Sequence, residues 1–291
     1  MEGNPATGGV RHRRPVLRSW EQVLKLTGYQ LRDYVFSRRF ILMIGLVAII
    51  GAILTFVFGY YRPAMFLSSS GAFYAIVWGG GATIVIIFAG VIFGGDAIAG
   101  EFQNKTGYFL MGLPLRRATV YLGKYIAAFV AALAAVVFYA LLVLANSAYY
   151  FGGGALTWSF GESFVLAIVY LLALLGATFL FSSLFKTSTY ATLVVAVLFL
   201  FGFMLLQDLI SGLVHITPWF ILTYADTVIG GVFNTSCMSS PGTHTCPSSF
   251  PGGSPMTVTN ATILQGVAIM LAYFVITAVV GLLLFEREEF T

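Results

Sequence analysis

Six long runs of apolar, uncharged residues set the strongest limit on how this chain can fold. A transmembrane helix needs about 20 consecutive apolar residues to cross the hydrocarbon core of a bilayer. Backbone groups inside lipid must bond within their own segment, so each run is predicted to be a helix. The shortest run, the fifth, could extend past Asp208. The predicted spans are Phe40–Tyr60, Phe73–Gly95, Tyr125–Tyr150, Ser163–Phe185, Thr189–Leu206 and Ile263–Phe285.

Composition supports an all-α polytopic membrane protein. Apolar residues make up 59% of the 291 positions and charged residues only 9%, whereas soluble domains carry about 25% charged residues. The first apolar run is longer than the apolar region of a secretory signal peptide, so we expect it to stay in the membrane. The net charge of +4 does not indicate a nucleic-acid partner, because the basic residues lie beside the predicted spans.

The basic residues also predict the orientation. Fourteen of the 15 Lys and Arg residues fall on one side of the six-span arrangement, and only Arg62 falls on the other. Under the positive-inside rule this places both termini in the cytoplasm, in a multi-pass protein of the cell membrane. The fourteen residues are Arg11, Arg13, Arg14, Arg18, Lys25, Arg32, Arg38, Arg39, Lys105, Arg116, Arg117, Lys124, Lys186 and Arg287.

Three parts of the chain follow from this arrangement. Residues 1–16 are rich in Gly, Pro and Arg and are expected to be a disordered basic tail. Residues 17–39 carry apolar side chains at i, i+3 and i+4 spacing, which predicts an amphipathic helix on the inner leaflet. A helix packed against a partner protein would show the same pattern. Residues 40–291 form the six-helix domain, with a cytoplasmic segment at 96–118 and an extracytoplasmic segment at 209–262.

The extracytoplasmic segment contains an apolar stretch, His215–Gly230, that is interrupted by Pro218 and Asp226. We expect a re-entrant or interfacial helix pair there, because irregular backbone at membrane depth needs protein or water around it. We expect Cys237 and Cys246 to form a disulfide, because an oxidising compartment favours one. Two free thiols are the alternative, and metal binding is a weaker one. Asn234 and Asn260 begin N-glycosylation sequons.

No catalytic, metal or cofactor site is predicted. The sequence contains no HExxH, CxxC or GxSxG motif and no phosphate-binding loop around Lys124. The predicted spans have no ionisable residue near their centres, which argues against a mechanism driven by protons or sodium. If the protein is energised, ATP hydrolysis is therefore expected in a separate chain.

The segment between the second and third spans carries the most specific pattern. It contains Asp96, Gly100-Glu101, Thr106-Gly107, Pro114, Arg116-Arg117 and Gly123-Lys124. Here the chain resembles the membrane subunits of ABC-type exporters, the type-two integral-membrane permease superfamily, although Thr-Gly inverts the commoner Gly-Thr. The resemblance extends to the amphipathic helix, the six spans, Pro218 and the closing Phe285-Glu286-Arg287-Glu288.

The resemblance implies a permease subunit that forms the substrate pathway as a dimer and is coupled to separate ATPase subunits. It implies that a coupling helix contacts the ATPase through Glu101, Gln103, Asn104, Lys105, Thr106 and Gly107. Asp96, Gly100, Pro114, Arg116, Arg117 and Lys124 would support that loop. We expect Glu101 to pair with a basic residue of the partner or to cap the helix. A non-pumping accessory subunit of a larger membrane complex is the alternative, with a membrane enzyme third.

Overall fold

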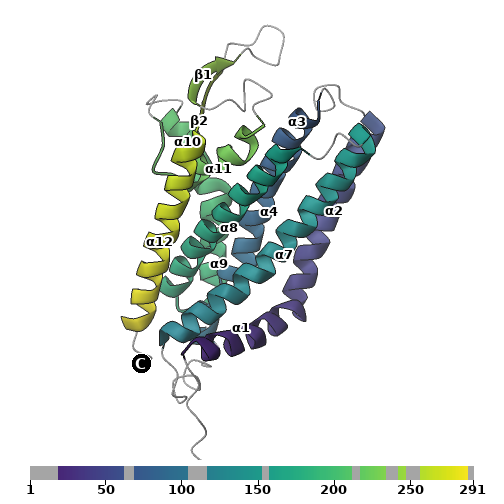
Figure 1. Ribbon diagram of the computed structural model, residues 1–291. Coiled ribbons are helices and arrows are strands. Elements are labelled where there is room, and N and C mark those ends of the chain that lie inside the picture. The colour runs from purple at the N-terminus through teal and green to yellow at the C-terminus, as the bar shows by residue number, and fades with distance from the viewer. Residues whose placement is uncertain are drawn as a thin grey trace, which may run out of the picture.

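The computed structural model describes residues 19–61, 69–103, 117–152, 157–211, 217–233, 242–246 and 256–287. Six helices in these ranges are long and apolar enough to cross a membrane, which confirms the predicted all-α polytopic architecture (Figure 1). The fifth does run past Asp208. The six spans are Arg38–Tyr61, Ser70–Glu101, Arg117–Phe151, Trp158–Leu184, Ser188–Leu209 and Ile263–Phe285.

The middle three spans form the centre of the bundle. In the most apolar part of the second and fourth spans 61% of the residues are buried, and in the third 50%, against 17% in each of the other three. The third span is α7 (Arg117–Phe151) and the fourth is α8 (Trp158–Leu184). Small residues allow close approach, as membrane helices require. A Cβ at Gly176 of α8, for example, would lie 2.5 Å from Thr277 Oγ1 of α12 (Ile263–Arg287), which Figure 1 shows beside α8.

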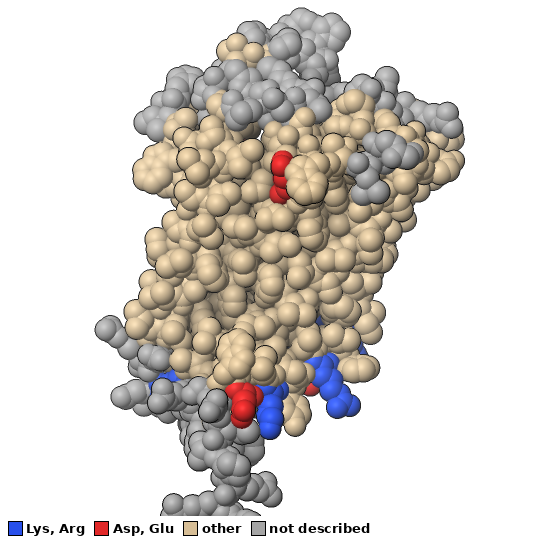
Figure 2. Space-filling view, in the orientation of Figure 1, with Lys and Arg blue, Asp and Glu red and all other residues tan. Residues whose placement is uncertain are grey.

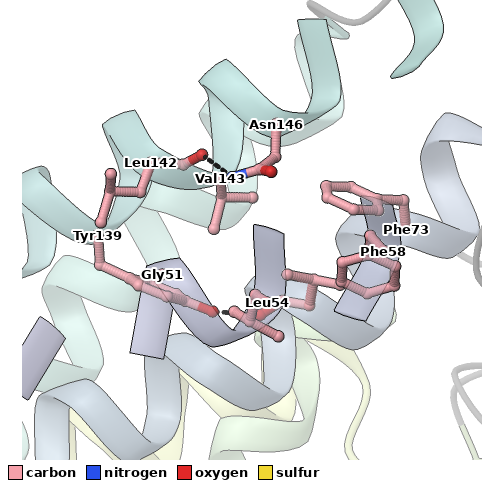
Figure 3. Close-up of a pocket in the computed structure, with 9 residues that line it drawn as sticks. Gly51, Leu54, Phe58, Phe73, Tyr139, Leu142, Val143 and Asn146 are labelled. Carbon is pink, nitrogen blue, oxygen red and sulfur yellow. Dashed lines mark hydrogen bonds between the residues drawn. The ribbon is translucent and has the colours of Figure 1, made fainter. Parts of the chain in front are cut away.

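The first span, α2 (Arg38–Tyr61), joins the bundle mainly through α7. A Cβ at Gly51 would come within 2.6 Å of Leu142 Cδ1, so the glycine allows the close contact. Figure 3 shows the small cavity beside it, where Phe58 and Phe73 face Asn146 across a gap of about 10 Å³. The Asn146 amide donates to the Leu142 carbonyl one turn earlier in its own helix at 2.9 Å. A space of this size holds at most one water molecule, so this gap is a packing defect rather than a binding site.

The predicted amphipathic helix is α1 (Ser19–Val35), which lies across the lower end of the bundle in Figure 1. Its buried face packs mainly on α7, where Thr27 Oγ1 donates to the Gly123 carbonyl at 3.2 Å. The buried Tyr34 contacts the second span, since its hydroxyl donates to the Phe93 carbonyl at 3.2 Å. Trp20 and Leu24 remain exposed. The apolar face is therefore divided between the chain's own bundle and the surroundings, and only the exposed part is available to lipid.

Two spans are not uniform α-helices. The second is built from α3 (Ser70–Phe73), the π-helical η1 (Tyr74–Gly80), α4 (Gly81–Gly94) and, after a turn, α5 (Ala99–Gln103). The fifth is built from α9 (Ser188–Val197), the π-helical η3 (Leu198–Gly202) and α10 (Phe203–Leu209). The Tyr139 hydroxyl of α7 donates to the Val77 carbonyl of η1 at 2.6 Å, which gives this irregular turn a tertiary partner.

The end of the bundle opposite α1 carries α11 (Leu222–Gly231) and two antiparallel strands, β1 (Gly242–Cys246) and β2 (Met256–Asn260). We call it the hairpin end. Residues 217–233 hold one helix after a turn at Pro218, where the sequence suggested a helix pair. The strands were not predicted. They alternate Thr with other residues, and β-branched side chains favour a strand once a second strand pairs with it.

Candidate functional site

Charged side chains in the described residues gather at the end of the bundle that holds α1, as Figure 2 shows. We call it the basic end; Arg39, Asp96, Glu101 and Lys124 lie there. The face between the two ends is a broad belt without charge in its lower and middle parts (Figure 2). Such a belt is what lipid requires, since a charged group in the bilayer centre is costly.

A buried ion pair fixes α5 to the third span. The Lys124 ammonium of α7 bonds to the Glu101 carboxylate and also donates to the Ala97 carbonyl at 2.9 Å. The Lys124 side chain is only 7% exposed and that of Glu101 only 18%. A buried lysine is tolerated only when it is paired and hydrogen-bonded, and here both conditions are met. Glu101, the residue expected to reach an ATPase, thus contacts its own chain.

The start of α5 is held by the fourth span. Ser182 of α8 accepts hydrogen bonds from the backbone N–H groups of Ile98 and Ala99, at 3.0 and 3.1 Å. The first N–H groups of a helix have no partner within the helix, so this hydroxyl replaces a local cap. The Asp96 carboxylate, just before α5, pairs with Arg39 of α2, whose side chain is 52% exposed.

The end of α5 contacts the fifth span. Gln103 is exposed, and its Oε1 accepts from the backbone N–H of Ser188, the first residue of α9, at 2.8 Å. That N–H is also a group without a partner inside its own helix. A helix of five residues is therefore linked by polar contacts to α7, α8 and α9, and residues 104–116 follow it directly.

The structure thus brings together Asp96, Gly100, Glu101, Gln103 and Lys124 from the predicted set. Gly100 donates its N–H to the Asp96 carbonyl at 2.8 Å, and Arg117 begins α7. Sequence reasoning missed Ser182, Ser188 and the role of Arg39, because a single hydroxyl or one basic residue among eight carries no spacing signal. Asn104, Lys105, Thr106, Gly107, Pro114 and Arg116 lie outside the described residues.

Two predictions concern the hairpin end. Cys246 is buried and disulfide-bonded, but its expected partner Cys237 lies outside the described residues, so that pairing stays a prediction. Asn234 also lies outside them. Asn260 is only 8% exposed at the end of β2, and in this position its amide is poorly accessible for glycosylation.

A cavity of about 630 Å³ lies in the half of the bundle nearer the hairpin end. One wall is η1 and α4, the opposite wall is η3 and α10, and α11 closes a third side. Its polar lining includes Thr83, Gln207, Asp208, Thr223, Asp226 and Asn260. No cluster of three or more His, Cys, Asp or Glu that could hold a metal ion occurs in the part of the chain that the structure describes.

The contacts of α5 and the cavity lie at opposite ends of the same helical bundle. The short helix α5 at the basic end contacts the third, fourth and fifth spans. The fifth span also lines the cavity near the hairpin end, opposite η1 and α4 of the second span, which leads into α5. No curated protein sequence matches the chain. A family model described as ABC-2 family transporter protein matches residues 26–290, nearly the whole chain, including α5, all six spans and α11. The chain therefore belongs to the ABC-2 family of transporter proteins.

Proposed function

We propose that this ABC permease is half of an ATP-driven exporter, which works as a dimer and is coupled to separate ATPase subunits at its basic end. The observation that carries the proposal is the placement of α5. It ends in the exposed Gln103, continues directly into residues 104–116, and is bonded to three spans. A protein that binds at the basic end would contact α5, a short helix whose displacement would affect several spans together.

The polar contacts of α5 suggest how ATPase movement would reach the substrate pathway. The backbone N–H of Ser188, the first residue of α9, donates to Gln103. Helix α9 continues into η3, which forms one wall of the cavity. On the other side, α5 follows α4, which helps to form the opposite wall. A shift of α5 would thus act on both walls. Glu101 would act in this scheme as a positioning residue, because its carboxylate holds α5 on Lys124.

Orientation and dimerisation are parts of the same proposal. The positive-inside rule favours a cytoplasmic basic end in the cell membrane, where ATP is available. Asp208 of α10 is exposed on the cavity side of the fifth span, next to the half-buried Gln207. A carboxylate near membrane depth is costly against lipid and normally faces protein or water. A second permease chain across this face would cover it and enclose the pathway.

The test is copurification of the tagged permease with ATP-binding subunits from its own cells, followed by ATP hydrolysis assays in lipid nanodiscs. Glu101→Lys places two cations together and should release α5, so we expect less ATPase to copurify and less hydrolysis per complex. Glu162→Lys is the matched control, since Glu162 is exposed at the start of α8, outside the α5 contacts.

Two results would contradict the proposal. If the Glu101→Lys permease binds the ATPase and supports hydrolysis like the wild type, α5 is not the coupling element. If no ATPase binds the wild-type chain, the accessory-subunit alternative becomes the better explanation.

A further inference from the structure

The cavity between the second and fifth spans combines a mostly apolar wall with two carboxylates. Ile84, Phe201 and Met204 contribute apolar surface, while Asp208 and Asp226 reach the same space from α10 and α11. Among the described residues that line it there is no Lys, Arg or His. Its volume of about 630 Å³ falls within the range of about 300–1,000 Å³ that small-molecule pockets occupy.

Asp226 lies in α11, which is not one of the six spans, and is partly exposed where it faces the cavity. Neither ion pair in the described part of the chain involves it. Burial raises the pKa of its carboxyl to about 8, and the nearby Tyr170 hydroxyl of α8 offsets this only in part, without a hydrogen bond of regular geometry. The charged form of this group therefore has no counter-ion among the described residues, and with this pKa the carboxyl is mostly protonated near pH 7 while the cavity is empty. A cation in the cavity would stabilise the ionised form.

The position of Asp226 is fixed by the packing of α11. Gly230 of α11 and Gly79 of η1 touch backbone to backbone, since a Cβ at Gly79 would lie 2.7 Å from the Gly230 Cα. Ser163 of α8 donates to the Ile229 carbonyl and accepts from the indole N–H of Trp78 at 2.9 Å. The carboxylate is thus presented by a helix that is anchored on two spans, as a pre-organised binding group must be.

Both long walls of the cavity are π-helical where they face it. Ala75, Ile76 and Gly79 of η1 line one side, and Phe199 and Phe201 of η3 line the other. π-Helical turns are rare and occur frequently at functional sites. Two of them on opposite walls of one cavity indicate a site for a ligand rather than a gap left by packing.

We propose that this cavity binds a compact amphipathic cation, with the apolar body between the two π-helical walls and the positive charge directed to Asp226 and Asp208. The inference rests on the proposed function and assigns its pathway a substrate class. Charge selects the ligand: a cation would favour ionisation of Asp226 and attract both carboxylates, whereas an anion would meet no basic group among the described lining residues. The exposed Phe201 adds an aromatic side chain, and aromatic rings attract cations.

The test uses the purified permease alone and two ions of matched size and shape, tetraphenylphosphonium and tetraphenylborate. Binding is measured by titration calorimetry in the same detergent micelles for the wild type, Asp226→Asn and the control Glu162→Gln. Asp226→Asn removes the carboxylate from the cavity and should weaken tetraphenylphosphonium binding about tenfold. Tetraphenylborate binding should stay equal or become stronger, and Glu162→Gln should match the wild type with both ions.

Equal affinity of all three proteins for tetraphenylphosphonium would overturn the inference, as would tighter binding of tetraphenylborate to the wild type. Asp208→Asn gives an independent test if Asp226→Asn does not fold, because Asp208 is exposed and a substitution there should be tolerated. Asp208→Asn should weaken tetraphenylphosphonium binding severalfold. Unchanged binding would count against the site. This assay needs no ATPase, so loss of the proposed ATPase coupling and loss of cation binding are separate results.

Discussion

Replacing Lys124 by Met should destabilise the permease far more than breaking the other ion pair at the basic end. The change takes the Lys124 ammonium away from the Glu101 carboxylate and removes the 2.9 Å donor of the Ala97 carbonyl. Breaking a buried pair by removing one member costs about 3–5 kcal/mol. Glu101 is 18% exposed, so water can reach part of its charge, and we expect the lower figure, about 3 kcal/mol.

The double variant Glu101→Gln/Lys124→Met should recover part of this loss. It removes both charges, so the remaining cost is the unpaired Ala97 carbonyl, about 1–3 kcal/mol. A double-mutant cycle should therefore give a favourable coupling energy between the two side chains, because the double variant costs less than the two single variants together. The Arg39–Asp96 pair is the internal comparison, because Arg39 is 52% exposed. Exposed pairs contribute about 0–1 kcal/mol, so its cycle should give less.

Both cycles can be measured by SDS titration of the purified protein in mixed micelles, followed by tryptophan fluorescence. The free energy of unfolding is compared at one detergent composition, with the slope of each transition checked. The reasoning fails if the Lys124→Met protein is as stable as the wild type. It also fails if the Arg39–Asp96 coupling equals or exceeds that of Glu101–Lys124, because burial would then not determine the strength of the pair.

Four further predictions follow from single features. Gly79→Ala forces a Cβ against the Gly230 backbone and should cost about 1–3 kcal/mol in the same titration, whereas Gly80→Ala, with nothing within 4 Å of its Cβ, should be tolerated. Ser182→Ala removes the cap of α5 and should cost about 1 kcal/mol and reduce ATPase copurification; Ser183→Ala, which loses only a bond within α8, should not reduce copurification. Intact-mass analysis after alkylation without reductant should find no free thiol on the two cysteines, and reduction should cost about 2–3 kcal/mol. A reporter that works only outside the cytoplasm, fused after the last residue, should stay inactive, and a bright fusion would reject the six-span topology.

The spans could be predicted because hydrocarbon imposes length and polarity on every helix that crosses it. The partner of Glu101 could not be predicted from the sequence. Lys124 lies 23 residues further along the chain, on a different helix, and only the packing of α5 against α7 brings the two side chains together. The π-helical turns could not be predicted from the sequence either. Tyr74–Gly80 and Leu198–Gly202 have the same apolar composition as the α-helical turns around them.

Asp226 shows a different limit. In the sequence it indicated only that its segment was not a transmembrane helix, because Pro218 and Asp226 both interrupt the apolar run. Its place in a cavity depends on walls from the second and fifth spans, which are far apart in sequence. The strands of the hairpin end were missed for a related reason: a Thr-rich segment becomes a strand only when a second one pairs with it.

The contacts that hold α5 also determine when it can form during synthesis. Ile98 and Ala99 find their acceptor on Ser182, and Gln103 finds its donor on Ser188, more than 80 residues later in the chain. The fourth span and the start of the fifth must therefore be synthesised before α5 can make these contacts. If α5 couples the permease to an ATPase as proposed above, a nascent or truncated chain would lack the assembled helix, and ATPase subunits would bind only chains whose membrane insertion has passed that point.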